Sequence, residues 1–221
     1  MTQQARNTYQ DLHAEVTAAA ARLVAVSKQR PVVKIEELYA LGQRDFGENR
    51  VPELLEKASA LPDDVRWHFI GHLQRNKVKP ILPFVDLIHS GDSARLLRTI
   101  NRHARELDRP IRVLLQFHVA REASKYGLDP HRPFAVLDEL SEEDRTHLRL
   151  AGVMGMATYT DDEERVGKEF DLLREVFDQL RASGRVDAEE FRELSMGMSG
   201  DYRLALARGA TLVRVGSLLF R

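Results

Sequence analysis

Lys28 has the residue type and the position that a covalent carbonyl site requires. It follows a short apolar run from Leu23 to Val26, β-branched at Val24 and Val26, with Ser27 between the run and the lysine. Such a run predicts a buried strand. At the carboxyl end of a strand, apolar walls around the stem disfavour the ammonium form and favour a nucleophilic amine. A lysine that only begins a surface loop is the alternative.

Two loops near the end of the chain have the small residues that a phosphate site uses. The segment SMGMSGD (Ser195 to Asp201) follows a predicted strand and leads into a helix predicted to begin at about Ser199, and Gly216-Ser217 ends the last predicted strand. In α/β barrels the loops after strands seven and eight often hold phosphate. Backbone N–H groups and a helix N-terminus favour the anion there, and Ser199 and Ser217 could add hydroxyl donors. Ordinary turn chemistry is the alternative.

Arg214 alternates with Val213 and Val215 in the last predicted strand, so its side chain is predicted to point into the fold. An unpaired guanidinium there would be costly. A ring nitrogen of a ligand would give it a partner and would stay unprotonated beside it. A salt bridge to a carboxylate such as Glu48 is the alternative, and the pattern leaves both open.

The sequence gives weaker evidence of a functional role for Asn49 and for the histidines. Asn49 follows the second predicted strand and could contact a ligand oxygen, although capping of the next helix is the interpretation that the sequence favours. His68 and His72 are four residues apart but straddle Gly71, which argues against a helical metal pair. No metal site is predicted.

Apolar runs that alternate with helical patterns along the whole chain must position these residues. The predicted strands are 23–26, 44–46, 66–70, 85–89, 111–119, 148–156, 191–194 and 212–215. The main predicted helices are 5–21, 33–41, 51–61, 93–107, 133–140, 161–183 and 199–208. This alternation is typical of a parallel α/β fold, and eight strands close a (β/α)8 TIM barrel. An open doubly wound sheet is the alternative, but its glycine fingerprint is missing after the first strand.

Composition bounds the class of protein. The 221 residues, 33 of them basic and 34 acidic, give a net charge of −1, so no overall field attracts nucleic acid or an anionic membrane. Cysteine is absent, which excludes disulfides and thiolate chemistry. There is no signal-like or membrane-spanning run. We expect one soluble, cytoplasmic domain over 1–221.

Six segments in this order and spacing resemble the YggS/PROSC family of pyridoxal phosphate (PLP) homeostasis proteins, from about Val24 to Phe220. They are AVSKQRP, RDFGENRVPELLEKA, RWHFIGHLQRNKVK, AGVMGMA, ELSMGMSGDY and GATLVRVGS. WHFIGHLQ.NK and SMGMSGD are the most specific of them.

This resemblance implies a fold-type III barrel similar to the N-terminal domain of alanine racemase, with PLP bound as an internal aldimine to Lys28. It implies that Arg214 lies near the pyridine nitrogen and Asn49 beside the ring. The residues implied to hold the phosphate are Ser199, Gly216 and Ser217. The implied role is vitamin B6 and amino-acid homeostasis by carrying or buffering PLP, with PLP-requiring apo-enzymes as candidate recipients.

The chain departs from the family pattern at three places. Gln29-Arg30 replaces a threonine-lysine pair, Phe117-His118 replaces valine-asparagine near the ring, and the chain stops at Phe220-Arg221 without the usual basic tail.

A racemase needs an acid/base group on each face of the substrate carbon. Lys28 can be the acid/base group on one face. In alanine racemase the group on the other face comes from an additional domain, for which this chain has no room. Tyr159 and Tyr202 lie near predicted strand ends without a catalytic motif, and Arg214 would weaken the electron sink. We therefore expect a non-catalytic, monomeric PLP carrier. The alternatives are a PLP-dependent racemase or lyase of unknown substrate, and a colourless phosphate-binding barrel enzyme in which Lys28 binds an anion.

Overall fold

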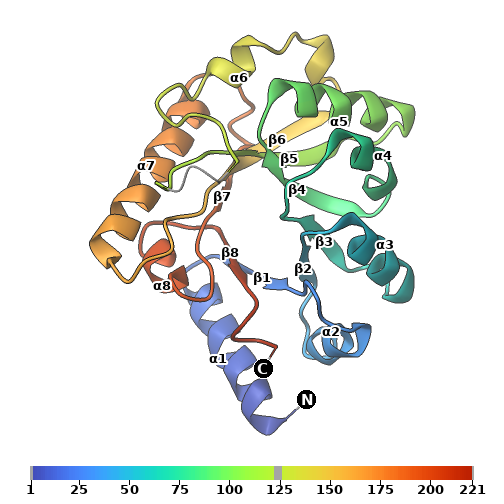
Figure 1. Cartoon of the computed structure of the whole chain (residues 1–221), viewed down its shortest axis with the longest axis vertical. Coiled ribbons are helices and arrows are strands. Elements are labelled where there is room, and N and C mark those ends of the chain that lie inside the picture. Colours follow the sequence, from blue (N-terminus) through green and yellow to red (C-terminus); the bar gives the residue numbers. More distant parts are fainter. Residues whose placement is uncertain (1, 122–125, 221) are drawn as a thin grey trace.

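Eight parallel strands close into a barrel in which each pairs with the next along the chain and β8 pairs with β1 (Figure 1). The computed structural model describes residues 2–121 and 126–220. The strands are β1 (Arg22–Val26), β2 (Asp45–Glu48), β3 (Arg66–Phe69), β4 (Val85–Gly91), β5 (Ile111–Gln116), β6 (Leu148–Met154), β7 (Glu193–Ser195) and β8 (Leu212–Val215). The prediction of a (β/α)8 barrel is confirmed.

The helices surround the ring of strands in Figure 1. They are α1 (Gln3–Ala18), α2 (Val32–Tyr39), α3 (Val51–Ala60), α4 (Val78–Ile81), α5 (Ala94–Glu106), α6 (Ala135–Asp138), α7 (Glu163–Ala182) and α8 (Tyr202–Leu206), with single 3₁₀ turns at Arg75–Lys77 and Glu143–Arg145. Within the described ranges, no helix combines the length and apolar character needed to cross a membrane.

Local sequence explains where the longer helices begin and which face they bury. Thr2 caps α1 by accepting from the backbone N–H of Ala5, and Asp162 caps α7 by accepting from that of Arg165. Such caps satisfy donors that the first helical turn leaves open. The buried face of α7 comprises Val166, Gly167, Glu169, Phe170, Leu173, Val176, Phe177 and Leu180. This spacing is the amphipathic pattern that packs a helix on a sheet.

The apolar core has two layers. The larger lies between the strands and the helices, and the smaller fills the barrel itself with Val24, Leu87, Leu114, Ala151, Met154 and Leu212. Alternate side chains of a strand point to opposite faces. Val24 therefore faces the barrel interior, whereas its neighbour Ala25 belongs to the outer layer.

Three predicted elements are much shorter than expected. The helix predicted over 199–208 begins only at Tyr202, because the preceding residues form a turn in which Asp201 Oδ1 accepts from the backbone N–H of Met198 at 2.5 Å. The strand predicted to reach Val119 ends at Gln116, after which Phe117 makes an isolated bridge with Leu128. The helix predicted over 133–140 is a single turn, α6.

Candidate cofactor site

The carboxyl ends of β1, β2, β7 and β8 bring the candidate residues to one edge of the barrel. In a parallel barrel all strands end at the same face, where the chemistry of this fold is located. Val26 of β1 pairs with Gly47 of β2, so Lys28 and Asn49 each lie two residues beyond a matched pair. Ala25 pairs with Val215 of β8 on the other side. The candidate residues therefore come from neighbouring strands.

Lys28 lies in a tight turn directly after β1. Arg30 N–H donates to Ser27 O at 3.0 Å, and Gln29, whose φ is +59°, donates its N–H to Glu53 Oε2 at 2.7 Å. These bonds fix the backbone on both sides of the lysine. The Lys28 side chain is exposed, so the expectation of an amine enclosed by apolar walls is wrong. Lys28 lies two residues beyond the end of β1, outside the buried part of the strand.

A buried ion cluster behind that turn holds it in place, and the sequence analysis missed it. Lys57 of α3 donates to Glu48 Oε1 at 2.7 Å and to the carbonyl of Ser27 at 2.9 Å, and it lies 3.3 Å from Glu53 Oε2. Ser27 Oγ donates to the same Glu48 oxygen at 2.6 Å. Burial raises the pKa of Glu48 against the opposing effect of Lys57 and Ser27. The cluster could have been inferred in part from the sequence, because Glu53 and Lys57 are four residues apart on a predicted helix and therefore lie side by side.

Arg214 points into the barrel, as its alternation with two valines predicted. It is buried, and it donates from Nη1 to Ser195 Oγ at 2.5 Å and from Nη2 to Gly155 O at 3.0 Å. Burial lowers the pKa of the guanidinium to about 10. The salt bridge to Glu48 is not formed, because Glu48 faces the outer layer and pairs with Lys57.

Asn49 does not cap the helix that follows it. The N-cap residue of α3 is Arg50, and it makes no side-chain capping bond. Instead, Asn49 Oδ1 is buried and, among the described residues, has no hydrogen-bond partner. Gly71 packs against this residue so closely that a Cβ there would lie 2.3 Å from Asn49 O. An acceptor held this rigidly without a donor is costly by about 1–3 kcal/mol, which favours a ligand contact.

The loops after β7 and β8 meet, as expected for a phosphate site. The backbone N–H of Gly216 donates to Ser199 Oγ at 3.3 Å. Gly197 has a φ of +89°, and a Cβ there would lie 2.6 Å from Ala205 Cβ. Ser217 is exposed at the end of the strand. The helix N-terminus expected at Ser199 is displaced to Tyr202, so the groups that could donate to an anion here are loop N–H groups and hydroxyls.

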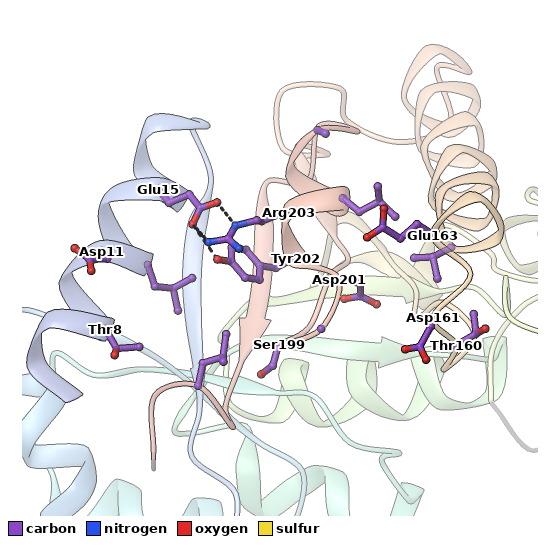
Figure 2. Close-up of a pocket in the computed structure, with 16 residues that line it drawn as sticks. Thr8, Asp11, Glu15, Thr160, Asp161, Glu163, Ser199, Asp201, Tyr202 and Arg203 are labelled. Carbon is purple, nitrogen blue, oxygen red and sulfur yellow. Dashed lines mark hydrogen bonds and ion pairs between the residues drawn. The ribbon is translucent and has the colours of Figure 1, made fainter. Parts of the chain in front are cut away.

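A large cavity lies beside this site rather than in it. It has a volume of about 850 Å³ and is bounded by α1, α8 and the residues before α7 (Figure 2). Of the predicted site residues only Ser199 lines it. Its acidic lining residues are Asp11, Glu15, Asp161, Glu163 and Asp201. Carboxylates repel a phosphate dianion, so this cavity is a poor place for one.

The remaining residues singled out from the sequence lie elsewhere. Tyr202 donates its hydroxyl to Glu15 Oε2 at 2.9 Å in the outer cavity, and Tyr159 is 96% exposed. Phe117 is buried in the outer core, next to a half-buried His118. Within the described ranges, no group of three or more His, Asp or Glu side chains could hold a metal ion. Of the C-terminal pair, Arg221 lies outside the described residues.

The fold and the site define an α/β barrel of the alanine racemase N-terminal type. The family model described as "Alanine racemase, N-terminal domain" matches residues 2–221. The chain belongs to the family of pyridoxal phosphate homeostasis proteins, as two curated relatives with that name show. The relative from Aquifex aeolicus is 40% identical, covering 90% of this chain and 86% of that protein, and the one from Helicobacter pylori is 38% identical, covering 90% and 87%.

A solved structure supports the same assignment. PipY of Synechococcus elongatus, determined with PLP bound, is 36% identical and superimposes with a TM-score of 0.86 over 99% of this chain and 100% of PipY. The resemblance inferred from sequence motifs is thereby confirmed at the level of the family and of the fold.

Proposed function

We propose that this protein binds PLP at the carboxyl end of its barrel and serves PLP homeostasis as a carrier, with Lys28 forming a Schiff base to the cofactor. The support is the family name of its relatives and the PLP in PipY. When bound, PLP supplies an aldehyde that a lysine amine can attack. The exposed position of Lys28 suits an amine that loads cofactor from solution and releases it.

The observation that carries the proposal is the buried Asn49 Oδ1, which has no hydrogen-bond partner in the part of the chain that the structure describes. A bound ligand with a hydrogen-bond donor at this place would satisfy that acceptor. Asn49 follows β2 beside Lys28, so one small ring could contact both residues. Ser199, Gly216 and Ser217 would hold the phosphate, and Arg214 would face the ring nitrogen.

The same residues favour a carrier over an enzyme. A guanidinium only donates, so Arg214 would keep the ring nitrogen unprotonated and would weaken the electron sink that racemisation uses. Tyr202, one candidate for a second acid/base group, is engaged by Glu15 outside the barrel. A PLP-dependent racemase or lyase is the second candidate, favoured only by the shared barrel.

The test is the visible absorbance of the purified protein with added PLP, before and after borohydride. Wild type should be yellow and should bleach on reduction, with the label on Lys28. Lys28→Ala should stay colourless, whereas Lys34→Ala, which removes a partly exposed lysine paired with Glu37, should behave as wild type. A colourless wild type would overturn the proposal and favour a barrel that only binds anions.

We further propose that the chain acts as one domain, as a monomer, in the cytoplasm, and that PLP-requiring apo-enzymes receive its cofactor. Light scattering after gel filtration tests the oligomeric state: the expected mass is that of one chain, 25.2 kDa. A stable dimer would contradict it.

A further inference from the structure

A line of buried polar side chains crosses the barrel interior from β8 to β2. Arg214 Nη1 donates to Ser195 Oγ at 2.5 Å, and Ser195 Oγ lies 3.1 Å from His89 Nδ1. His89 Nε2 lies 2.9 Å from His68 Nδ1, and His68 Nε2 lies 2.9 Å from Asp45 Oδ1. At most 5% of any of these residues is exposed. Every link is within hydrogen-bond distance, so the line is continuous.

The two ends fix the direction of every bond between them. A guanidinium can only donate, and an ionised carboxylate can only accept. Asp45 therefore accepts from His68 Nε2–H, which makes Nδ1 of a neutral His68 the acceptor for His89 Nε2–H. His89 Nδ1 in turn accepts the hydroxyl proton of Ser195, whose oxygen accepts from Arg214. With both rings neutral and protonated on Nε2, every link of the line joins one donor to one acceptor.

The electrostatics of the line favour a neutral His89 and an ionised Asp45. Burial lowers the pKa of His89 well below its usual value, and the charge of Arg214 acts in the same direction. At the other end burial acts to raise the pKa of Asp45, but hydrogen bonds from His68 and Arg66 outweigh it and hold that pKa well below its usual range. A cationic His68 would donate from Nδ1 to His89, and His89 would then donate from Nδ1 to Ser195 Oγ. The Ser195 hydroxyl proton would be left without an acceptor in the line.

The far end of the line reaches charged groups at the amino ends of the strands. Arg66 binds Asp45 at 2.6 Å, and Arg22 lies 3.6 Å from the same carboxylate. Arg66 is almost half exposed, so solvent reaches this end. Hydrogen bonds therefore connect the buried Arg214 to the carboxylate of Asp45. Glu48, the other candidate carboxylate, forms its ion pair with Lys57.

We propose that Ser195, His89, His68 and Asp45 are positioning residues, a hydrogen-bond relay that fixes the orientation of the Arg214 guanidinium and holds its positive charge toward the ring nitrogen of bound PLP. The relay rests on the proposed function. Ser195 holds Nη1 while Gly155 O holds Nη2, so the relay and one carbonyl together set the plane of the guanidinium. If the relay did not orient Ser195, the guanidinium plane could rotate about the one hydrogen bond left, from Nη2 to Gly155 O.

The first experiment reads the relay in the protein without cofactor. Two-bond ¹⁵N–¹H correlation spectra of histidine-labelled protein at neutral pH should show His68 and His89 as Nε2–H tautomers, the form that the direction of the hydrogen bonds requires. An Nδ1–H tautomer or a cationic ring at either position would overturn the relay.

The second experiment reads the ¹⁵N shift of the ring nitrogen of labelled PLP bound to the protein. Asp45→Asn, which removes the charge at the far end, and His89→Phe, which keeps a ring but cuts the line, should both move it. Asp86→Asn is the matched control, because Asp86 pairs with Arg112 at the same end of the barrel without joining the relay, and it should leave the shift unchanged.

The outcomes separate the two proposals. If PLP binds and both variants keep the wild-type shift while remaining folded by circular dichroism, the relay is wrong and the proposed function stands. If His89→Phe fails to fold, Asp45→Asn decides alone. If wild type takes up no PLP, the proposed function is wrong, and the relay has no ring nitrogen on which to act.

Discussion

The backbone N–H of Gly216 and the hydroxyl oxygen of Ser199, both implied to hold a phosphate, are bonded to each other at 3.3 Å. This distance is long for an N–H···O bond. A phosphate oxygen can therefore replace Ser199 as the acceptor at Gly216, and the Ser199 hydroxyl proton remains available to donate to the same anion. The bond joins the loops after β7 and β8.

Gly216→Ala should weaken PLP binding at least about tenfold, the equivalent of 1.4 kcal/mol. The added Cβ would lie 3.0 Å from Val26 O and 3.2 Å from Val26 Cβ, so β8 must move away from β1. Gly200→Ala is the matched control in the same region, because a Cβ there meets nothing within 4 Å. Equilibrium titration by absorbance measures both; equal affinities for the two variants would contradict the prediction.

Asn49→Ala should lower PLP affinity without lowering the stability of the cofactor-free protein. It removes a buried acceptor that has no partner in the described structure, an arrangement that costs about 1–3 kcal/mol. Urea unfolding without PLP and titration with PLP measure the two effects. A clear loss of stability without cofactor would mean that Asn49 has a structural role instead.

Lys57→Met should destabilise the protein by about 3–5 kcal/mol, because it leaves Glu48 buried beside no cation. The turn that carries Lys28 should loosen with it, since Lys57 also binds Ser27 O. Lys168→Met is the control: Lys168 pairs with Glu164 on the exposed surface of α7, where such pairs contribute about 0–1 kcal/mol. Urea unfolding at neutral pH measures the free energy of unfolding of both variants. Equal losses of stability in the two would contradict a structural role for the buried pair.

Asp45→Asn should flatten the loss of stability in acid. The pKa of Asp45 is lower in the folded chain than in the unfolded chain, so the unfolded state binds more protons as the pH falls below the ordinary aspartate value of 3.8. The stabilising contribution of Asp45 is thus complete above that pH and is lost progressively below it. Urea unfolding at a series of pH values between about 3 and 7 should show a shallower acid limb in the variant. An unchanged slope would mean that Asp45 is not held as an anion.

Much of the fold followed from periodicity. Alternating apolar runs and helical patterns predicted eight strands, and the alternation of Arg214 with Val213 and Val215 predicted its direction correctly. Boundaries were less accurate where a side chain intervened, as when Asp201 closed a turn and delayed α8. Such bonds depend on loop conformation rather than on hydrophobic spacing.

By itself, the sequence determined the barrel, the family and the strand ends at which Lys28, Asn49, Ser199, Gly216 and Ser217 lie, because residue type and spacing are local properties. Tertiary structure alone decided the partners. Closure of the barrel paired Glu48 with Lys57 rather than with Arg214 and aligned His68 and His89 between Asp45 and Ser195. It also left Asn49 Oδ1 without a hydrogen-bond donor among the described residues. Those pairings join residues from different strands and helices, and buried polar groups take whichever partner the packed fold brings within reach.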